Sequence, residues 1–300
     1  MSPVRPDFPV VGQRLDPEHH RLRDFLTRSA QPYTWLDAES PEAQALLAEH
    51  GAQEAALPVL IDDGRVVAGA TVERVAALWD IGGPPKRTSY DLAIVGGGPA
   101  GLAAAVYAAS DGLSTVVIEE DLPGGQASHT SMIENFFGFP DGIGGAELCR
   151  LAGRQAERFG AEIVMRRGVE GSGRRGPDGP FTARLRGGYE VEARIALVAA
   201  GMIWRRLDVE GVEALLGRGV YYGAGRSEAT QCANEHVIVV GAGNSAGQAV
   251  MSLVAAGATS TMSAVISSPL ESIATGGFPG SRRPPVTPFR IRSSAPKRSA

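Results

Sequence analysis

Residues 90–102 read YDLAIVGGGPAGL, and this stretch decides the fold of the central part of the chain. Tyr90 to Val95 form an apolar run of strand length, which is followed by a glycine-rich turn and a helix of small residues. In such a turn Gly96 permits the tight bend, Gly98 lets backbone amides approach a pyrophosphate, and Gly101 allows close helix packing. The stretch predicts a Rossmann-like dinucleotide-binding unit. Its predicted binding residues are Gly96, Gly98, Pro99, Ala100 and Gly101.

An acidic residue at the end of the next strand strengthens this prediction. Leu113 to Glu119 form that strand, and Glu119 stands where a carboxylate binds the ribose hydroxyls of the adenosine. A GxGxxG pattern alone is a weak signal. Placed after an apolar strand and followed by an acid, it favours nucleotide binding over a plain glycine-rich turn.

A second strand, turn and helix of the same kind occurs later in the chain. His236 to Val240 form the strand, and a helix runs from the turn to Ala256. Two nucleotide-binding units in one chain are more informative than either alone. The predicted binding residues of this second turn are Gly241, Gly243, Asn244, Ser245 and Ala246.

Composition excludes several classes of partner. The chain has 300 residues, 43% of them hydrophobic, a net charge of -4 and a pI near 5.8, so two or three globular domains without affinity for nucleic acid or anionic membranes are expected. No targeting segment or membrane span is recognisable, and a cytoplasmic protein with a small-molecule ligand is predicted. Only Cys149 and Cys232 are present, which excludes a disulfide framework and a cysteine-rich metal site. His19 and His20 are expected to be solvated surface residues rather than metal ligands.

The first eighty or so residues alternate as β-α-β-α-β-β-α, with Pro58 opening the strand before a hairpin. This order resembles the thioredoxin and glutaredoxin fold, and the resemblance implies a cis peptide bond at Pro58. Redox-active members carry Cys-x-x-Cys where this chain has Leu15 to Glu18, without cysteine. A docking or scaffold role is therefore expected for this module.

Three further segments resemble the thioredoxin-reductase branch of the flavoprotein disulfide reductases. They are Gly124-Gly125-Gln126, the stretch from Ile133 to Pro140, and Ala199-Ala200-Gly201. The resemblance implies FAD in the first nucleotide-binding domain, with Gln126 and Asn135 near the flavin ring and its ribityl chain. Gly201 would lie where the chain leaves the FAD domain. For the second turn it implies NADPH or NADH, with Asn244 where aspartate is common.

The dithiol of that family is missing from this sequence. Gly223 and Arg226 stand where the resemblance places its two cysteines, and Cys232 lies six residues further on. The favoured function is a FAD-dependent oxidoreductase that accepts hydride from NADPH or NADH and passes electrons to an unidentified acceptor. Candidate partners are the nucleotides, a redox protein as acceptor and a second copy in a homodimer. The alternatives are a non-catalytic nucleotide-binding interaction protein and a truncated, inactive fragment.

The predicted fold class is α/β: an N-terminal thioredoxin-like domain, a Rossmann-like FAD domain and an incomplete second Rossmann-like NAD(P) domain. The predicted boundaries are 1–83, 88–205 and 206–264, followed by a disordered basic tail over 265–300. This tail is rich in proline, serine and arginine, which could serve as a nucleic-acid arm; a shifted reading frame is the favoured interpretation. The Gly-Asp return segment that completes the family's flavin site is not found after Ala264.

Overall fold

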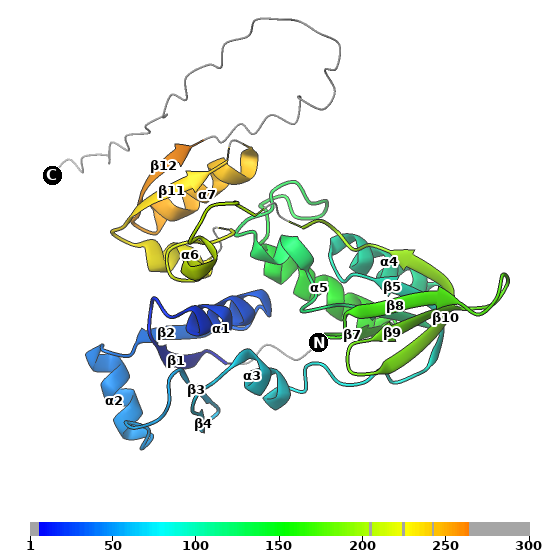
Figure 1. Cartoon of the computed structure of the whole chain (residues 1–300), viewed down its shortest axis with the longest axis horizontal. Coiled ribbons are helices and arrows are strands. Elements are labelled where there is room, and N and C mark those ends of the chain that lie inside the picture. The colour runs from blue at the N-terminus through cyan, green and yellow to red at the C-terminus, as the bar shows by residue number, and fades with distance from the viewer. Residues whose placement is uncertain (1–5, 204–205, 224–225, 242, 264–300) are drawn as a thin grey trace, which may run out of the picture. The chain divides into compact units, whose positions relative to one another are not determined.

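The computed structural model of the protein describes residues 6–203, 206–223, 226–241 and 243–263 (Figure 1). Within these residues the chain forms two compact units, one that ends at Tyr222 and one that begins at Gly223. Segment 206–222, grouped by the sequence with the second nucleotide-binding domain, thus belongs to the first unit. It does so because it packs on the N-terminal part, where the ring of Tyr221 lies 5.0 Å from that of His20. The predicted tail over 265–300 lies outside the described residues.

A four-stranded sheet with three helices makes up residues 6–83, which we call the N-terminal module. The strand order is β2-β1-β3-β4, with β1 parallel to β2 and antiparallel to β3. The element order agrees with the sequence prediction, and the Leu57–Pro58 peptide bond is cis, as expected. Its elements are β1 (Phe8–Gly12), α1 (Pro17–Arg28), β2 (Tyr33–Asp37), α2 (Pro41–Glu49), β3 (Val59–Asp62), β4 (Arg65–Val67) and α3 (Val72–Leu78).

Local signals explain where the helices of this module begin. Asp16 caps α1 by accepting hydrogen bonds from the N–H groups of Glu18 and His19. Ser40 and Thr71 cap α2 and α3 in the same way. The apolar faces of α1 and α3 meet the sheet in one buried cluster. That cluster contains Phe8, Val10, Leu22, Phe25, Leu26, Leu60, Ala70, Val75, Ala76, Trp79 and Leu122.

A six-stranded sheet forms the core of residues 88–203, which we call the central domain. The strand order is β7-β6-β5-β10-β9-β8. Strands β7, β6, β5 and β10 are parallel, and β10 also begins an antiparallel meander with β9 and β8. The strands are β5 (Ser89–Val95), β6 (Thr115–Ile118), β7 (Glu162–Val164), β8 (Val169–Arg174), β9 (Phe181–Leu185) and β10 (Tyr189–Val198). This arrangement confirms the predicted α/β class.

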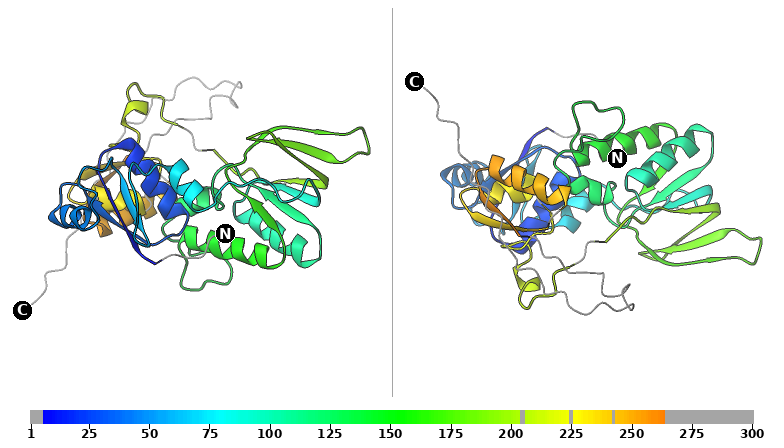
Figure 2. Two further views of the ribbon diagram at one scale, coloured as in Figure 1. Left: turned by 90° about the horizontal axis from the view of Figure 1, so that it is seen from below. Right: turned by 90° about the horizontal axis from the view of Figure 1, so that it is seen from above.

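Two helices lie side by side on one face of this sheet, as both views of Figure 2 show. They are α4 (Pro99–Ser110) and α5 (Gly145–Arg158). Alanines of α4 and α5 pack against Leu92, Ile94 and Val117 of the parallel strands in a buried cluster. The small residues after the glycine turn therefore serve close packing between helix and sheet, as the sequence predicts.

Three details of the central domain differ from the sequence prediction. The apolar pattern of the sequence predicts two strands, at 189–192 and at 195–200. The structure has a single strand, β10, because its first residues pair with β9 and its later residues with β5. Strand β8 was not predicted, since its two glycines obscure the alternation and only pairing with β9 holds it extended. The sequence predicts the helix after the glycine turn over 102–109, but α4 begins at Pro99, whose fixed φ suits a first helical position.

The second unit contains a short parallel β-α-β element. Strand β11 (His236–Val240) pairs with β12 (Thr259–Ser263) in parallel, and α7 (Asn244–Ala255) connects them. A short helix α6 (Arg226–Ala229) and a 3-10 turn (Thr230–Cys232) precede β11. No helix within the described ranges has both the length and the apolar character needed to cross a membrane.

Candidate functional site

The glycine turn between β5 and α4 can be built only with glycine at two positions. Gly96 has a φ of +104°, and a Cβ there would collide with the carbonyl oxygen of Ala199. A Cβ at Gly101 would collide with the carbonyl oxygen of Gly96. The turn is therefore tight, with the helix packed directly against the strand end, as the sequence predicts for a dinucleotide-binding unit.

The start of α4 is open on the side where a ligand would approach. Its N-cap is Gly98, which offers no side-chain hydrogen bond to the first-turn amides. A Cβ built on Gly98 would meet no heavy atom within 4 Å, and Ala100 is exposed. Uncapped amides at a helix N-terminus, together with the positive end of the helix dipole, favour a phosphate group. These residues fit the pyrophosphate of a dinucleotide.

Glu119 is held at the same edge of the sheet. Its Oε2 accepts a hydrogen bond from the backbone N–H of Gly97 at 2.7 Å, and its Oε1 accepts one from the backbone N–H of Asp121 at 3.0 Å. The strand pairing explains this proximity, because Val95 and Ile118 are partners and Gly96 donates to the carbonyl of Ile118. The side chain is nearly buried, so the carboxylate is fixed in position before any ligand binds.

Residues 119–129, which we call the cofactor loop, pack against the glycine turn. The N–H of Gly124 donates to the carbonyl of Gly97 at 2.8 Å, and a Cβ built on Gly125 would lie 3.6 Å from the Cα of Gly98. Both glycines have positive φ, so the loop can approach this closely. The 3-10 turn η1 (Gly125–His129) begins at the second of them.

Gln126 of this loop carries a buried acceptor. Its Oε1 is shielded from solvent and has no hydrogen-bond partner among the described residues. A buried polar atom of this kind normally finds a partner in a ligand or a water molecule. This observation agrees with the resemblance, which places Gln126 beside the flavin ring and its ribityl chain.

Gly201 follows the segment that lies against Gly96, whereas Asn135 is exposed to solvent. Gly201, with a φ of +70°, follows Ala199, whose carbonyl lies against Gly96. Asn135 is exposed on a loop that is closed by two hydrogen bonds between Ile133 and Ile143. The binding roles of both residues stay predictions.

The glycine turn of the second unit also leads into an uncapped helix. Gly243 is the N-cap of α7, again without a side-chain cap, and a Cβ built there would meet no heavy atom within 4 Å. Gly241 has a φ of +153°, and its built Cβ would lie 3.2 Å from the Cβ of Ala246. Ala246 occupies the position of Gly101 in the first turn. Ser245 is exposed at the first turn of α7, which begins at Asn244.

The cysteines and histidines are placed by packing. Cys149 of α5 lies 1% exposed against Gly124, and burial raises the pKa of its thiol to about 11. Cys232 is also buried. The prediction of a solvated His19 was wrong: its ring is buried because Nδ1 accepts from the N–H of Gln13 and the ring packs near Trp35. The part of the chain that the structure describes contains no cluster of metal-ligating side chains.

Sequence reasoning missed the residues that join the N-terminal module to the cofactor loop. Arg28 donates to a carboxylate oxygen of Asp121 at 2.7 Å, and Leu122 is buried in the core of the module. Arg28 looked like a basic residue of a helix end, and Leu122 like one apolar residue of a loop. No local pattern signals that Arg28 contacts Asp121 or that Leu122 enters the core of the module.

Comparisons with known proteins agree with this geometry. A profile of the pyridine nucleotide-disulphide oxidoreductase family matches residues 90–274, which include both glycine turns. Thioredoxin reductase of Bacillus subtilis (strain 168) is 39% identical over 160 residues, covering 52% of this chain and 48% of that protein. One component of the alkyl hydroperoxide reductase of Xanthomonas campestris pv. phaseoli is 30% identical over 201 residues, covering 65% of this chain and 37% of that protein.

The structural comparison points the same way. The crystal structure of Lactococcus lactis thioredoxin reductase in its FR conformation superposes with a TM-score of 0.54 at 31% identity, covering 58% of this chain and 56% of that one. This chain spans about half the length of the curated thioredoxin reductases that it matches. Thioredoxin reductases use FAD and NADPH. Because the family profile matches more than half of its residues, this chain belongs to the pyridine nucleotide-disulphide oxidoreductases and is similar to their thioredoxin reductases.

Proposed function

We propose that this chain is a FAD-dependent oxidoreductase that accepts hydride from NADPH or NADH and passes electrons to an acceptor without a dithiol of its own. The proposal is carried by the edge of the central sheet, where the open start of α4 and the fixed carboxylate of Glu119 lie together. Phosphate-binding amides next to a ribose-binding carboxylate form the recognition pattern of a dinucleotide.

Each residue of the edge has a separate task in this proposal. The uncapped amides after Gly98 bind the pyrophosphate, and Glu119 orients the adenosine ribose. Gln126 supplies its buried acceptor to the flavin portion. Bound FAD would accept the hydride and pass the electrons on, while the chain positions the FAD and supplies the electrostatic environment. In the second unit, the open turn at Gly243 binds the pyrophosphate of the nicotinamide nucleotide.

The cysteine content of the chain favours a separate molecule as the electron acceptor. The sequence holds Cys149 and Cys232 alone, and Cys149 is a buried thiol with a raised pKa, which disfavours the reactive thiolate. Gly223 and Arg226 replace the cysteines that the family resemblance would place there. Electrons therefore leave to a separate molecule, for which a redox protein is our proposal.

Flavin uptake and reduction test the function directly. The purified chain is mixed with FAD, passed over a desalting column and examined for a flavin spectrum. NADPH or NADH is then added under anaerobic conditions, and bleaching of the bound flavin is expected with one or both. A chain that retains no flavin at micromolar concentrations contradicts the proposal, as does bound flavin that neither nucleotide bleaches.

A nucleotide-binding interaction protein is a second candidate, favoured by exposed apolar surface beside the site. Ile195 and Val198 of β10 are 60% and 72% exposed, although their strand lies inside the sheet next to β5. Exposed apolar surface of this kind is typical of an interface with another chain. Flavin binding without reduction by either nucleotide would select this second function.

A further inference from the structure

The cofactor loop is anchored in the core of the N-terminal module. Leu122, in the middle of the loop, is 2% exposed and belongs to the same buried cluster as Phe25 of α1 and Trp79. Burial of a leucine side chain removes apolar surface from water and thereby stabilises the contact. The module therefore makes an apolar contact with a loop that belongs to the central domain.

Arg28, at the end of α1, grips the loop at two points. Its Nη1 donates to Oδ2 of Asp121 at 2.7 Å, and its Nε donates to Oγ of Ser128 at 3.2 Å. The side chain of Arg28 is 12% exposed, so water screens these contacts only in part. Asp24 of the same helix lies 3.5 Å from His129 of the loop and 3.5 Å from Arg28.

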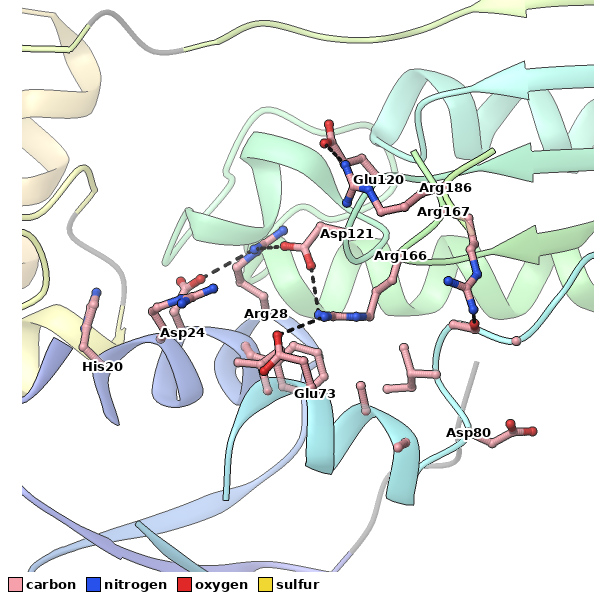
Figure 3. A pocket seen from close by; sticks show the side chains of 18 of the residues that line it. His20, Asp24, Arg28, Glu73, Asp80, Glu120, Asp121, Arg166, Arg167 and Arg186 are labelled. Atoms are coloured by element: carbon pink, nitrogen blue, oxygen red, sulfur yellow. Dashed lines mark hydrogen bonds and ion pairs between the residues drawn. The ribbon is translucent and has the colours of Figure 1, made fainter. Parts of the chain in front are cut away.

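A second basic residue continues this contact toward α3. Arg166 follows β7, and its guanidinium lies 3.7 Å from the carboxylate of Asp121 and 3.3 Å from that of Glu73 (Figure 3). Its backbone N–H donates to the carbonyl of Asp121. Asp121 is thus held from the module by Arg28 and from the central domain by Arg166.

Several of these ion pairs lie at a cavity of about 1220 Å³ that is lined by residues of the module and of the central domain (Figure 3). Arginines line it, but Arg28, Arg166 and Arg186 are each paired with carboxylates of Asp121, Glu73 or Glu120. Their charge is used within the interface. Arg167, which also lines the cavity, donates to the backbone carbonyl of Gly82.

The opposite side of the same loop forms part of the proposed FAD site. The N–H of Asp121 donates to Glu119, and the N–H of Gly124 donates to the carbonyl of Gly97 in the glycine turn. Gln126, whose side-chain oxygen is a buried acceptor, lies in the sequence between Asp121 and Ser128, the two residues that Arg28 binds. A loop held on one side by the module and on the other by the turn can respond to both.

We propose that the N-terminal module regulates the FAD site by fixing the cofactor loop, so that docking of the module and binding of FAD stabilise each other. This inference rests on the proposed function. Arg28 and Leu122 act as positioning residues: Arg28 of the module binds the loop, and Leu122 of the loop enters the core of the module. Linkage requires the effect to be reciprocal: whatever factor the module contributes to FAD affinity, FAD returns to the docking of the module.

The test measures the dissociation constant of FAD for the full chain and its variants by flavin fluorescence. Arg28→Ala and Leu122→Ala are each expected to weaken FAD binding about tenfold, which corresponds to about 1.4 kcal/mol. Arg28→Lys keeps the charge next to Asp121 but loses the fork that also reaches Ser128, so an intermediate effect is expected. This variant also serves if Leu122→Ala fails to fold.

Matched controls separate positioning from general destabilisation. Arg21→Ala removes an arginine of the same helix that is 63% exposed and pairs with Glu18. Leu47→Ala creates a cavity in the other core cluster of the module, away from the loop. Both controls are expected to bind FAD within twofold of the unaltered chain, although Leu47→Ala lowers the stability of the module as much as Leu122→Ala does.

Hydrogen exchange of the amides of residues 17–28 provides a further test. If Arg28 and Leu122 served only to stabilise the fold, FAD would not change the exchange rate in α1. FAD is expected to slow exchange in α1 of the unaltered chain and of both controls, but not of Arg28→Ala or Leu122→Ala. If these two variants bind FAD as tightly as the controls, or FAD leaves exchange in α1 unchanged, the coupling is refuted while the proposed function stands. If the unaltered chain binds no FAD, both fail.

Discussion

Gly97 donates its backbone N–H to Oε2 of Glu119 across 2.7 Å, which joins the glycine turn after β5 to the end of β6. The second oxygen of the same carboxylate accepts from the backbone N–H of Asp121, so one side chain ties the turn to the cofactor loop. Because Glu119 is nearly buried, its orientation is set by these two amides rather than by solvent. The carboxylate is thereby preorganised for a ligand at the sheet edge.

Replacing this carboxylate should affect both stability and binding. Glu119→Ala leaves the amides of Gly97 and Asp121 without an acceptor, which is expected to lower the free energy of unfolding by about 1–3 kcal/mol. FAD affinity should fall as well. Urea unfolding and flavin titration measure the two effects. The control is Glu120→Ala, whose side chain is 71% exposed and pairs with Arg186, and which should change stability by less than about 1 kcal/mol. Equal behaviour of the two variants would contradict the role of Glu119.

Two glycines of the same turn should respond differently to alanine. Gly101→Ala places a Cβ against the carbonyl of Gly96, so the helix must shift and the protein should lose about 1–3 kcal/mol of stability. Gly98→Ala points into open space and should leave thermal unfolding unchanged. Its Cβ stands where the pyrophosphate is expected, so FAD affinity should fall. A Gly98→Ala variant with unaltered FAD affinity would show that the dinucleotide does not approach α4 here.

The buried thiol of Cys149 predicts a loss of stability in alkali. Burial raises its pKa to about 11 in the folded chain, above the ordinary value of 9.0, so the folded state binds this proton more tightly than the unfolded state. The contribution is complete below pH 9.0 and is lost as the pH rises toward 11, by at most about 1.4 kcal/mol per pH unit. Cys149→Ser should remove this part of the slope in unfolding measured between these pH values. Parallel curves for the two proteins would contradict the assignment.

The contact between the module and the cofactor loop should weaken in acid. Burial by itself would raise the pKa of Asp24, but the hydrogen bond from His129 and the charge of Arg28 hold it below the ordinary value of 3.8. A lowered pKa contributes stability above pH 3.8 that is lost as the pH falls through the folded value. The difference in unfolding free energy between the unaltered chain and Asp24→Asn should therefore shrink as the pH falls below 3.8. A constant difference between them would contradict this sign.

Much of the fold could be predicted because its signals are local. The apolar run before Gly96, the small residues after Gly101 and the acid at Glu119 act within one strand, turn and helix. The helix starts at Asp16, Ser40 and Thr71 depend on a single side chain that reaches amides two or three residues away. Such interactions need no other part of the chain.

The sequence-based prediction of structure failed where contacts with distant segments decide the structure of a residue. The continuity of β10 comes from pairing with β9 on one side and β5 on the other, which its own residues do not encode. His19 looked like a surface residue at a helix start, yet the loop before α1 and Trp35 enclose it. In both cases packing overrides a local preference.

The sequence by itself determined the two strand-turn-helix units, the glycines that they require and the absence of a cysteine pair, since each depends on neighbouring residues or on composition. Tertiary structure alone decided that Leu122 enters the core of the N-terminal module and that Arg28 meets Asp121, 93 positions further along the chain. Contacts between segments so far apart arise only when two folded surfaces pack together. They leave no periodicity or spacing in either segment by which they could have been predicted.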